Sequence, residues 1–236
     1  MALSYKETLR ISETISMIPQ NIASILEVGC GDGRVSKGID GNFTLIGTDI
    51  RSSEINKFPG TKFISDISNL PIKDKIFDLV LSTEVLEHLD NETFLQALEE
   101  IARVAKKYIL ITVPFEENLS VQWMKCSICA QIFHAWGHLR KFNSQNLKEL
   151  FDGADLVEKR FLSPNESRIP PFTYIIVKKL GNVWSTGNSL CPKCGSKPLQ
   201  SEGNMFGKIL QRLIWRFIKV SPFKKPIWVG CLYEKS

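Results

Sequence analysis

Three glycines and two acids near the N-terminal end of the chain have the residue types of a nucleotide-binding site. Gly29, Gly31 and Gly33 occupy alternate positions directly after a short apolar run. Glycine there lets the chain turn sharply and lets a ligand touch the backbone. Glu27 lies at the end of that run, and Asp49 ends the next apolar run. A carboxylate at the end of a strand can accept both hydroxyls of a ribose.

The same stretch favours S-adenosylmethionine over a dinucleotide. A dinucleotide-binding loop has a further glycine at the position that holds Arg34 here. Glu27 opposes a pyrophosphate but suits a cationic group. A ribose joined to a cationic amino-acid tail describes S-adenosylmethionine, which we predict as the cofactor. The alternative interpretation is a tight strand-to-helix turn that binds no ligand.

A second group of residues could perform acid–base chemistry. Glu84, Glu87 and His88 are spaced so that a helix starting there would place all three on one face, and His138 comes from a later segment. Methyl transfer from a sulfonium mainly requires that the acceptor is positioned and loses its proton. The predicted catalytic residues are therefore His88, His138 and Glu87.

This acid–histidine group has two alternative interpretations. Glu84, Glu87, His88 and His138 could together hold a catalytic divalent ion that lowers the pKa of an acceptor hydroxyl. Alternatively, His88 caps or packs, His138 acts alone as the base, and the glutamates contact only water or the methionine end of the cofactor.

Two CxxC pairs have the spacing of zinc knuckles. Together they supply the four thiolates of a tetrahedral structural zinc site: Cys126, Cys129, Cys191 and Cys194. Gly195 follows the second pair, as is usual in knuckles, whereas Ala130 follows the first. An alternative zinc site keeps the first pair and adds His134 and His138.

The elements that position these residues follow from the hydrophobic pattern. Short apolar runs alternate with helical patterns, which is typical of a doubly wound parallel sheet covered on both faces. Strands are predicted at residues 25–29, 43–49, 62–65, 77–82, 109–113, 156–162 and 227–233, and helices at the N-terminus and at 91–106, 143–152 and 205–220.

Residues 25–113 resemble the Rossmann-like S-adenosylmethionine-dependent methyltransferases, in the branch that includes the quinone-biosynthesis O-methyltransferases. The motifs that carry the resemblance are LEVGCGDG, GTDI, SDISNLPI and FDLVLSTEVLEHL, and WGHLRKFNSQNLKELF extends it to about residue 151. The resemblance implies an α/β fold with a mostly parallel seven-stranded sheet that ends in an antiparallel hairpin, here with a zinc-ribbon-like insertion. It also favours Mg²⁺ as the divalent ion.

The resemblance implies cofactor contacts at Glu27, Gly29, Gly31, Asp49 and Asp66. Asp66 lies where an acid could reach the adenine amino group, and Ile67 could pack on the ring. The full set of predicted cofactor-binding residues is Glu27, Gly29, Cys30, Gly31, Gly33, Asp49, Ile50, Asp66, Ile67 and Glu84.

Composition and the C-terminal third of the chain indicate where in the cell the protein acts. The chain has 236 residues, a net charge of +5 and six cysteines, without a secretory signal or an apolar run of bilayer-spanning length. Six cysteines without a secretory signal predict a protein of the reducing cytoplasm, where paired cysteines more often bind metal than form disulfides. The amphipathic basic helix at 205–220 could lie on a membrane, cover a lipid-like substrate or pack on the sheet.

Two predictions concern organisation and activity. Residues 1–165 and 221–236 are predicted to form the methyltransferase domain, with insertions at 119–140 and 166–220.

The predicted acceptor is a hydroxyl on a small molecule, glycan or lipid-linked precursor. One alternative is RNA 2′-O-methylation, because ExxEH followed by a later histidine resembles small-RNA terminal methyltransferases, although stacking aromatics are not interleaved with the basic residues. The other is a non-catalytic, zinc-stabilised binding module.

Overall fold

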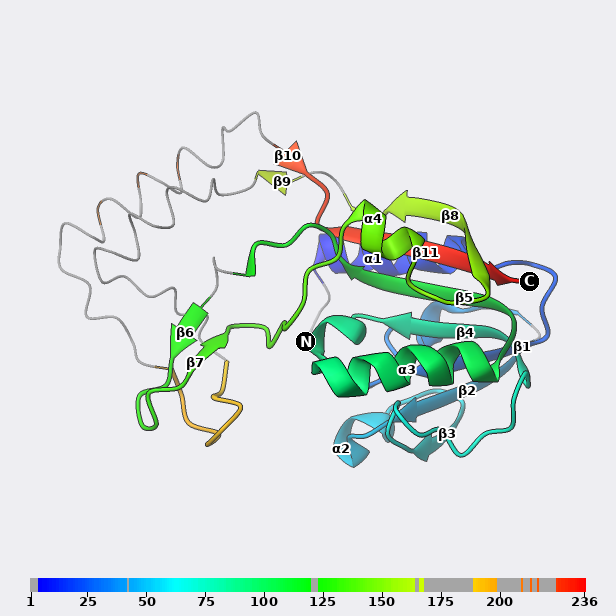
Figure 1. The fold of residues 1–236 in the computed structure, drawn as a ribbon, viewed down its shortest axis with the longest axis horizontal. Helices are drawn as coiled ribbons and strands as arrows, with labels where there is room; N and C mark the ends of the chain where they lie inside the picture. Colours follow the sequence, from blue (N-terminus) through cyan, green and yellow to red (C-terminus); the bar gives the residue numbers. More distant parts are fainter. Residues whose placement is uncertain are drawn as a thin grey trace. The chain divides into compact units, whose positions relative to one another are not determined.

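The structure is a computed structural model that describes residues 4–41, 43–119, 123–163, 166–167, 189–198, 209, 213, 216 and 224–236. The chain divides into two compact units (Figure 1). We call the first the sheet unit; it comprises Met1–Glu116, Phe142–Pro164 and Pro226–Ser236. We call the second the cysteine unit; it comprises Glu117–Lys141 and Asn165–Lys225.

The sheet unit contains a seven-stranded sheet of order β3-β2-β1-β4-β5-β11-β8. Its strands are β1 (Ser24–Val28), β2 (Thr44–Asp49), β3 (Thr61–Ile64), β4 (Phe77–Thr83), β5 (Ala105–Pro114), β8 (Ala154–Phe161) and β11 (Trp228–Lys235). The first five strands of this order are parallel, and β11 runs antiparallel to both β5 and β8. The predicted α/β fold, the mostly parallel sheet and the terminal antiparallel pair are therefore confirmed.

Helices cover both faces of this sheet (Figure 1). Adjacent residues of a strand point to opposite faces, so that Ile25 and Leu26 of β1 belong to two different core clusters. The cluster of Ile25 includes Ile11 of α1 (Tyr5–Ser16). The cluster of Leu26 includes Ile101 of α3 (Asn91–Val104) and Leu147 of α4 (Ser144–Lys148). This two-sided burial explains why the parallel strands are almost continuously apolar.

Side-chain caps and strand pairing set the helix limits. Ser4 and Glu7 form a capping box at the start of α1, and Asp90 caps α3 by accepting from the Thr93 N–H at 3.0 Å. The helix predicted at 91–106 ends at Val104, because Ala105 already pairs with Phe77 of β4. The helix predicted at 143–152 is a shorter α4, capped by Asn143.

The helix expected to begin at Glu84 does not form. Glu84 adopts a left-handed backbone with φ 56°, and only a 3₁₀ turn follows, η2 (Leu86–His88). The Glu84 N–H donates to the Thr112 carbonyl at 2.9 Å, which ties Glu84 to the end of β5. The prediction of one shared helix face for Glu84, Glu87 and His88 was therefore wrong: Glu87 is buried and His88 is exposed.

The cysteine unit contains short antiparallel pairs. Strands β6 (Trp123–Lys125) and β7 (Ile132–His134) pair with each other, as do β9 (Glu166–Ser167) and β10 (Lys224–Lys225). The helix predicted at 205–220 lies outside the described residues except for positions 209, 213 and 216, which are helical and exposed. No helix in the described part of the chain is long and apolar enough to cross a membrane.

Candidate functional site

The glycine loop lies where the strand order reverses, at the carboxyl ends of β1 and β4. In open α/β sheets, ligands bind in the crevice outside this reversal. Gly29, Gly31 and Gly33 have φ values of 68°, 52° and 73°, which favour glycine. A Cβ at Gly29 would overlap the Val85 side chain, whereas nothing lies within 4 Å of a Cβ placed at Gly31. The loop therefore packs closely at its start and leaves open space at its middle.

Asp49 is held directly against this loop. Its Oδ2 accepts from the Gly31 N–H at 2.8 Å, and its Oδ1 accepts from the Arg51 N–H at 2.8 Å. Both bonds orient the buried carboxylate at the end of β2, next to the open part of the loop. Each oxygen keeps a further lone pair, so that the carboxylate can also accept two hydroxyl groups.

Glu27 is a buried acid in the centre of the sheet. It is 1% exposed in β1, between β2 and β4, and the Ser36 hydroxyl donates to its Oε2. Ser36 begins the 3₁₀ turn η1 (Ser36–Gly38), which follows the glycine loop. Burial raises the pKa of the Glu27 carboxyl to about 7, with smaller contributions from Asp32 and Asp49. A cation beside Glu27 would favour its ionised form.

Apolar and polar groups at the ends of β2 and β3 complete this edge. Ile50 directly follows Asp49 and is 64% exposed, which is unusual for a large aliphatic side chain. Asp66 is exposed, and its Oδ1 accepts from the Ser68 N–H at 2.9 Å and from the Ser68 hydroxyl at 2.8 Å. Cys30 is instead buried with Ile55 and Phe58, and burial raises the pKa of its thiol to about 12.

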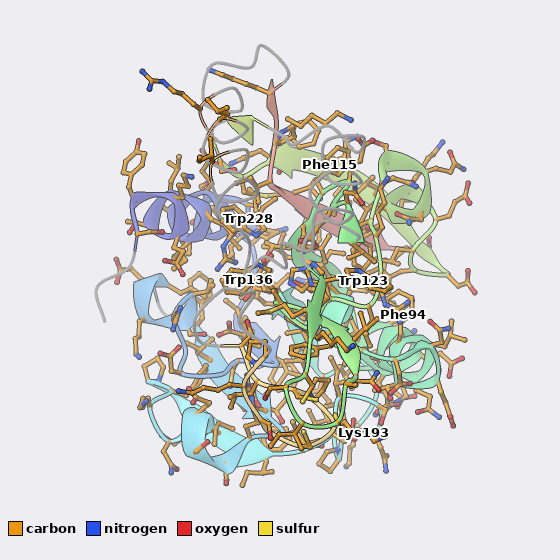
Figure 2. All side chains as sticks on the ribbon, turned by 90° about the vertical axis from the view of Figure 1, so that its left-hand side faces the viewer. Phe94, Phe115, Trp123, Trp136, Lys193 and Trp228 are labelled. Atoms are coloured by element: carbon orange, nitrogen blue, oxygen red, sulfur yellow. The ribbon has the colours of Figure 1, made fainter. Side chains whose placement is uncertain are left out.

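Arg10 is a buried cation that the sequence did not single out. It lies on the buried side of α1 and is 9% exposed. Its Nη1 is 3.8 Å from Glu84 Oε1, and its guanidinium carbon lies 5.4 Å from the ring centroid of Trp228, which Figure 2 labels. Within the described residues, Nε and Nη1 are buried and have no hydrogen-bond partner. A charged residue directly before Ile11 on the apolar side of a helical pattern was the available signal.

The residues of the predicted acid–histidine group come from both units. Glu84 lies after β4 and accepts from the Thr112 hydroxyl at 3.2 Å, while Glu87 and His88 belong to η2. His138 belongs to the cysteine unit, where its Nδ1 bonds to Glu117 Oε2. Their joint action stays a prediction.

The four cysteines gather inside the cysteine unit. Cys126 Sγ lies 3.4 Å from Cys194 Sγ, and Cys129 Sγ lies 3.6 Å from both Cys191 Sγ and Cys194 Sγ. Four thiolates about 2.3 Å from a zinc ion at the corners of a tetrahedron are separated by about 3.8 Å. The arrangement therefore fits a zinc-ribbon-like insertion.

The chain geometry around the cysteines is that of two knuckles. The Ile128 and Cys129 N–H groups each donate to Cys126 Sγ at 3.4 Å. Ala130 and Gly195, which follow the two pairs, both have a left-handed backbone, with φ 57° and 70°. A bridge between Cys126 and Pro198 joins the two segments. His134 and His138 lie with Glu117 instead, so that the geometry favours the four-cysteine set.

Comparison with known proteins agrees with this geometry. Residues 26–110 match the family model described as a methyltransferase domain. The chain is 37% identical over 164 residues to an uncharacterized protein of Methanocaldococcus jannaschii. The aligned residues cover 68% of this chain and 67% of that protein.

Solved structures show the same fold at lower identity. A Pyrococcus horikoshii protein superposes with a TM-score of 0.59 at 13% identity, covering 100% of this chain and 92% of that one. A chain of the complex that contains the Haloferax volcanii Trm112 methyltransferase activator has a TM-score of 0.58 at 14% identity, with coverage of 96% and 89%. An S-adenosylmethionine-dependent methyltransferase of Archaeoglobus fulgidus has a TM-score of 0.56 at 16% identity, with coverage of 98% and 95%. The glycine loop, the strand-end acids, the sheet order and these matches together make the chain a member of the class I S-adenosylmethionine-dependent methyltransferases.

Proposed function

We propose that this methyltransferase acts on a hydroxyl oxygen of a small-molecule, glycan or lipid-linked acceptor, as the quinone-biosynthesis-type branch does. S-adenosylmethionine supplies an activated methyl group, so the protein's task is to bind, orient and deprotonate. The observation that carries the cofactor half of this proposal is the buried Asp49 carboxylate bonded to the open glycine loop at Gly31. The acceptor half rests on the acid and histidine residues predicted from the sequence.

In this proposal each end of the cofactor meets a matching group. Asp49 accepts the ribose hydroxyls, and Asp66 the adenine amino group. The adenine ring packs on Ile50 and Ile67, which would explain the exposure of Ile50. The loop at Gly29, Cys30, Gly31 and Gly33 supplies backbone contacts, and Glu27 faces the ammonium group.

The acceptor's proton requires a base. We propose His88 or His138 in this role, with Glu87 in support, because histidine is the side chain that most often takes a proton from a reacting group. The acids and histidines of this group offer oxygen and nitrogen ligands, and a Mg²⁺ ion there would lower the pKa of the acceptor hydroxyl.

Transfer of a labelled methyl group tests the proposed function. Wild-type enzyme with methyl-labelled cofactor is expected to label a component of a metabolite or lipid fraction. Asp49→Ala should weaken cofactor binding in calorimetry by about 1–3 kcal/mol, the cost of leaving polar ligand groups unpaired. Asp40→Ala removes an exposed acid that precedes β2 and is the matched control. Labelling of RNA alone, with salt-dependent RNA binding, would replace this function by RNA methylation.

Arg10 is expected to bind the carboxylate of the cofactor's amino-acid tail. It is a buried cation beside Glu84, at the edge that carries the glycine loop, and Glu7, one turn before it in α1, reaches Arg34 of that loop at 3.5 Å. Arg10→Met keeps the apolar stem and removes the charge. Loss of a charged hydrogen bond costs about 1.5–3 kcal/mol, which is a roughly 10- to 150-fold loss of affinity for S-adenosylhomocysteine.

A matched ligand provides the control for Arg10. The compound 5′-methylthioadenosine has the same nucleoside but no amino-acid tail, and its affinity should be unchanged in Arg10→Met when both ligands are measured by calorimetry. An equal loss for both ligands would show that Arg10 only supports the fold.

We further propose that Cys126, Cys129, Cys191 and Cys194 hold a structural zinc ion and that residues 119–140 and 166–220 are an insertion built around it. Four thiolates leave no open coordination position, which is typical of structural rather than catalytic zinc. A cytoplasmic location and a peripheral membrane contact through residues 205–220 remain predictions from the sequence.

A further inference from the structure

In the cysteine unit, a glutamate lies beside two histidines that stack on each other. Glu117 Oε2 bonds to His138 Nδ1, and Glu117 Oε1 lies 3.9 Å from His134 Nε2. The two rings stack with centroids 5.0 Å apart and an angle of 27° between their planes. All three side chains are largely buried, at 13%, 12% and 3% exposure for Glu117, His138 and His134.

The local chain holds this group together. The Gly137 N–H donates to the His134 carbonyl at 2.9 Å, and Gly137 has φ 75°, so that a tight turn brings the two rings to the same side. The Ser189 hydroxyl donates to the Ala135 carbonyl at 2.7 Å and attaches the second cysteine segment to this turn. His134 also ends β7, opposite Trp123 of β6.

The hydrogen bonds assign the ring protons. An ionised carboxylate can only accept, so the proton in the bond between Glu117 and His138 must be on Nδ1. In a neutral imidazole the lone pair is then on Nε2. The His138 backbone N–H donates to His134 Nδ1 at 3.3 Å, so the proton of neutral His134 is on Nε2, facing Glu117.

The proton positions on the two rings argue against a metal ion bound by Glu117, His134 and His138. One carboxylate and two imidazoles would otherwise be suitable ligands. A ligating histidine normally donates the N–H of its other ring nitrogen. The Nδ1 of His134 instead accepts a backbone N–H, which leaves the proton on the nitrogen that a metal would need.

We propose that Glu117 is a positioning residue that holds His138 in the Nδ1–H tautomer, so that Nε2 is the atom that takes the acceptor's proton. His134 supports the pair by stacking on His138 and by binding its backbone. This inference rests on the proposed catalytic role of His138.

The ring tautomers can be measured without knowing the acceptor. The chain has three histidines, so nitrogen-15 histidine labelling gives an NMR spectrum that single substitutions can assign. At about pH 8.5, some two units above the ordinary histidine pKa, wild-type His138 is expected to show a protonated Nδ1 and an unprotonated Nε2. Glu117→Met removes the acceptor oxygens and should move most of the proton to Nε2. Glu117→Gln keeps an acceptor oxygen and should retain the wild-type tautomer.

Controls separate this inference from the proposed function. Glu99→Met removes an exposed acid on α3 and should leave the NMR signals of all three histidines unchanged. In Glu117→Met, labelled-methyl transfer to the acceptor fraction should fall about tenfold in kcat, with unchanged affinity for S-adenosylhomocysteine. A His138 tautomer that is unchanged in folded Glu117→Met would overturn the positioning role. A shifted tautomer with unchanged kcat would leave the positioning intact and overturn the catalytic role of His138.

Discussion

The double substitution Cys191→Ser/Cys194→Ser is expected to remove the zinc ion and unfold the cysteine unit locally. The purified wild-type chain should carry about one zinc ion, because four thiolates form one closed tetrahedral site. Structural zinc contributes about 10–16 kcal/mol of apparent binding free energy in small zinc-dependent folds. The described residues of this unit form short two-stranded pairs, and isolated two-stranded hairpins are marginal in water.

Elemental analysis and limited proteolysis measure this result. The double variant should contain almost no zinc and should be cleaved within the cysteine unit. The sheet unit should remain folded, because its core clusters are built from its own residues, and retained binding of S-adenosylhomocysteine would report that. His134→Asn is the informative control and should keep its zinc. Full zinc content in the double variant would instead assign the site to Cys126, Cys129, His134 and His138.

Glu27→Gln is expected to make the unliganded protein more stable at about pH 8 while weakening cofactor binding. In the folded protein the pKa of Glu27 is about 7, raised by burial from 4.5. Between these two values the folded state binds more protons than the unfolded state, so wild-type stability falls as the pH rises through this window. The difference in pKa corresponds to about 3 kcal/mol, an order-of-magnitude figure for a fully buried group. Glutamine stays neutral and avoids this loss.

Chemical denaturation at several pH values tests the stability effect. The free energy of unfolding of Glu27→Gln should match that of wild type below about pH 4.5 and exceed it increasingly up to about pH 7. A constant difference across this range would mean that Glu27 does not titrate in the folded protein.

Cofactor binding provides the second half of the same prediction. A bound ammonium group favours ionised Glu27, so at about pH 6 binding to wild type should release close to one proton. Calorimetry in two buffers of different ionisation enthalpy measures this proton, and Glu27→Gln should release none. The variant would thus exchange function for stability, as is common for strained or desolvated active-site groups.

The local spacing of residue types in the sequence was enough to predict the sheet, the glycine loop and the cysteine cluster. Alternating apolar runs and helical patterns predicted the sheet, because burial on both faces leaves a continuous apolar signal in each parallel strand. The glycines of the loop and Asp49 at the end of β2 followed from backbone and ligand chemistry that needs those residue types. The two CxxC pairs predicted the cysteine cluster, because knuckle spacing is set within a few residues of chain.

Only the tertiary structure decided features that depend on residues far apart in the chain. Arg10 becomes notable because folding buries it beside Glu84 and Trp228; the helical pattern could indicate that Arg10 is buried, but not which residues it meets. Glu84 leaves the helical region because its N–H pairs with the Thr112 carbonyl of another strand. Glu117 meets His138 across a turn and a hairpin. Periodicity reports which face of an element is buried, but which polar groups meet there depends on how the elements pack, because a hydrogen bond needs two specific atoms in one place.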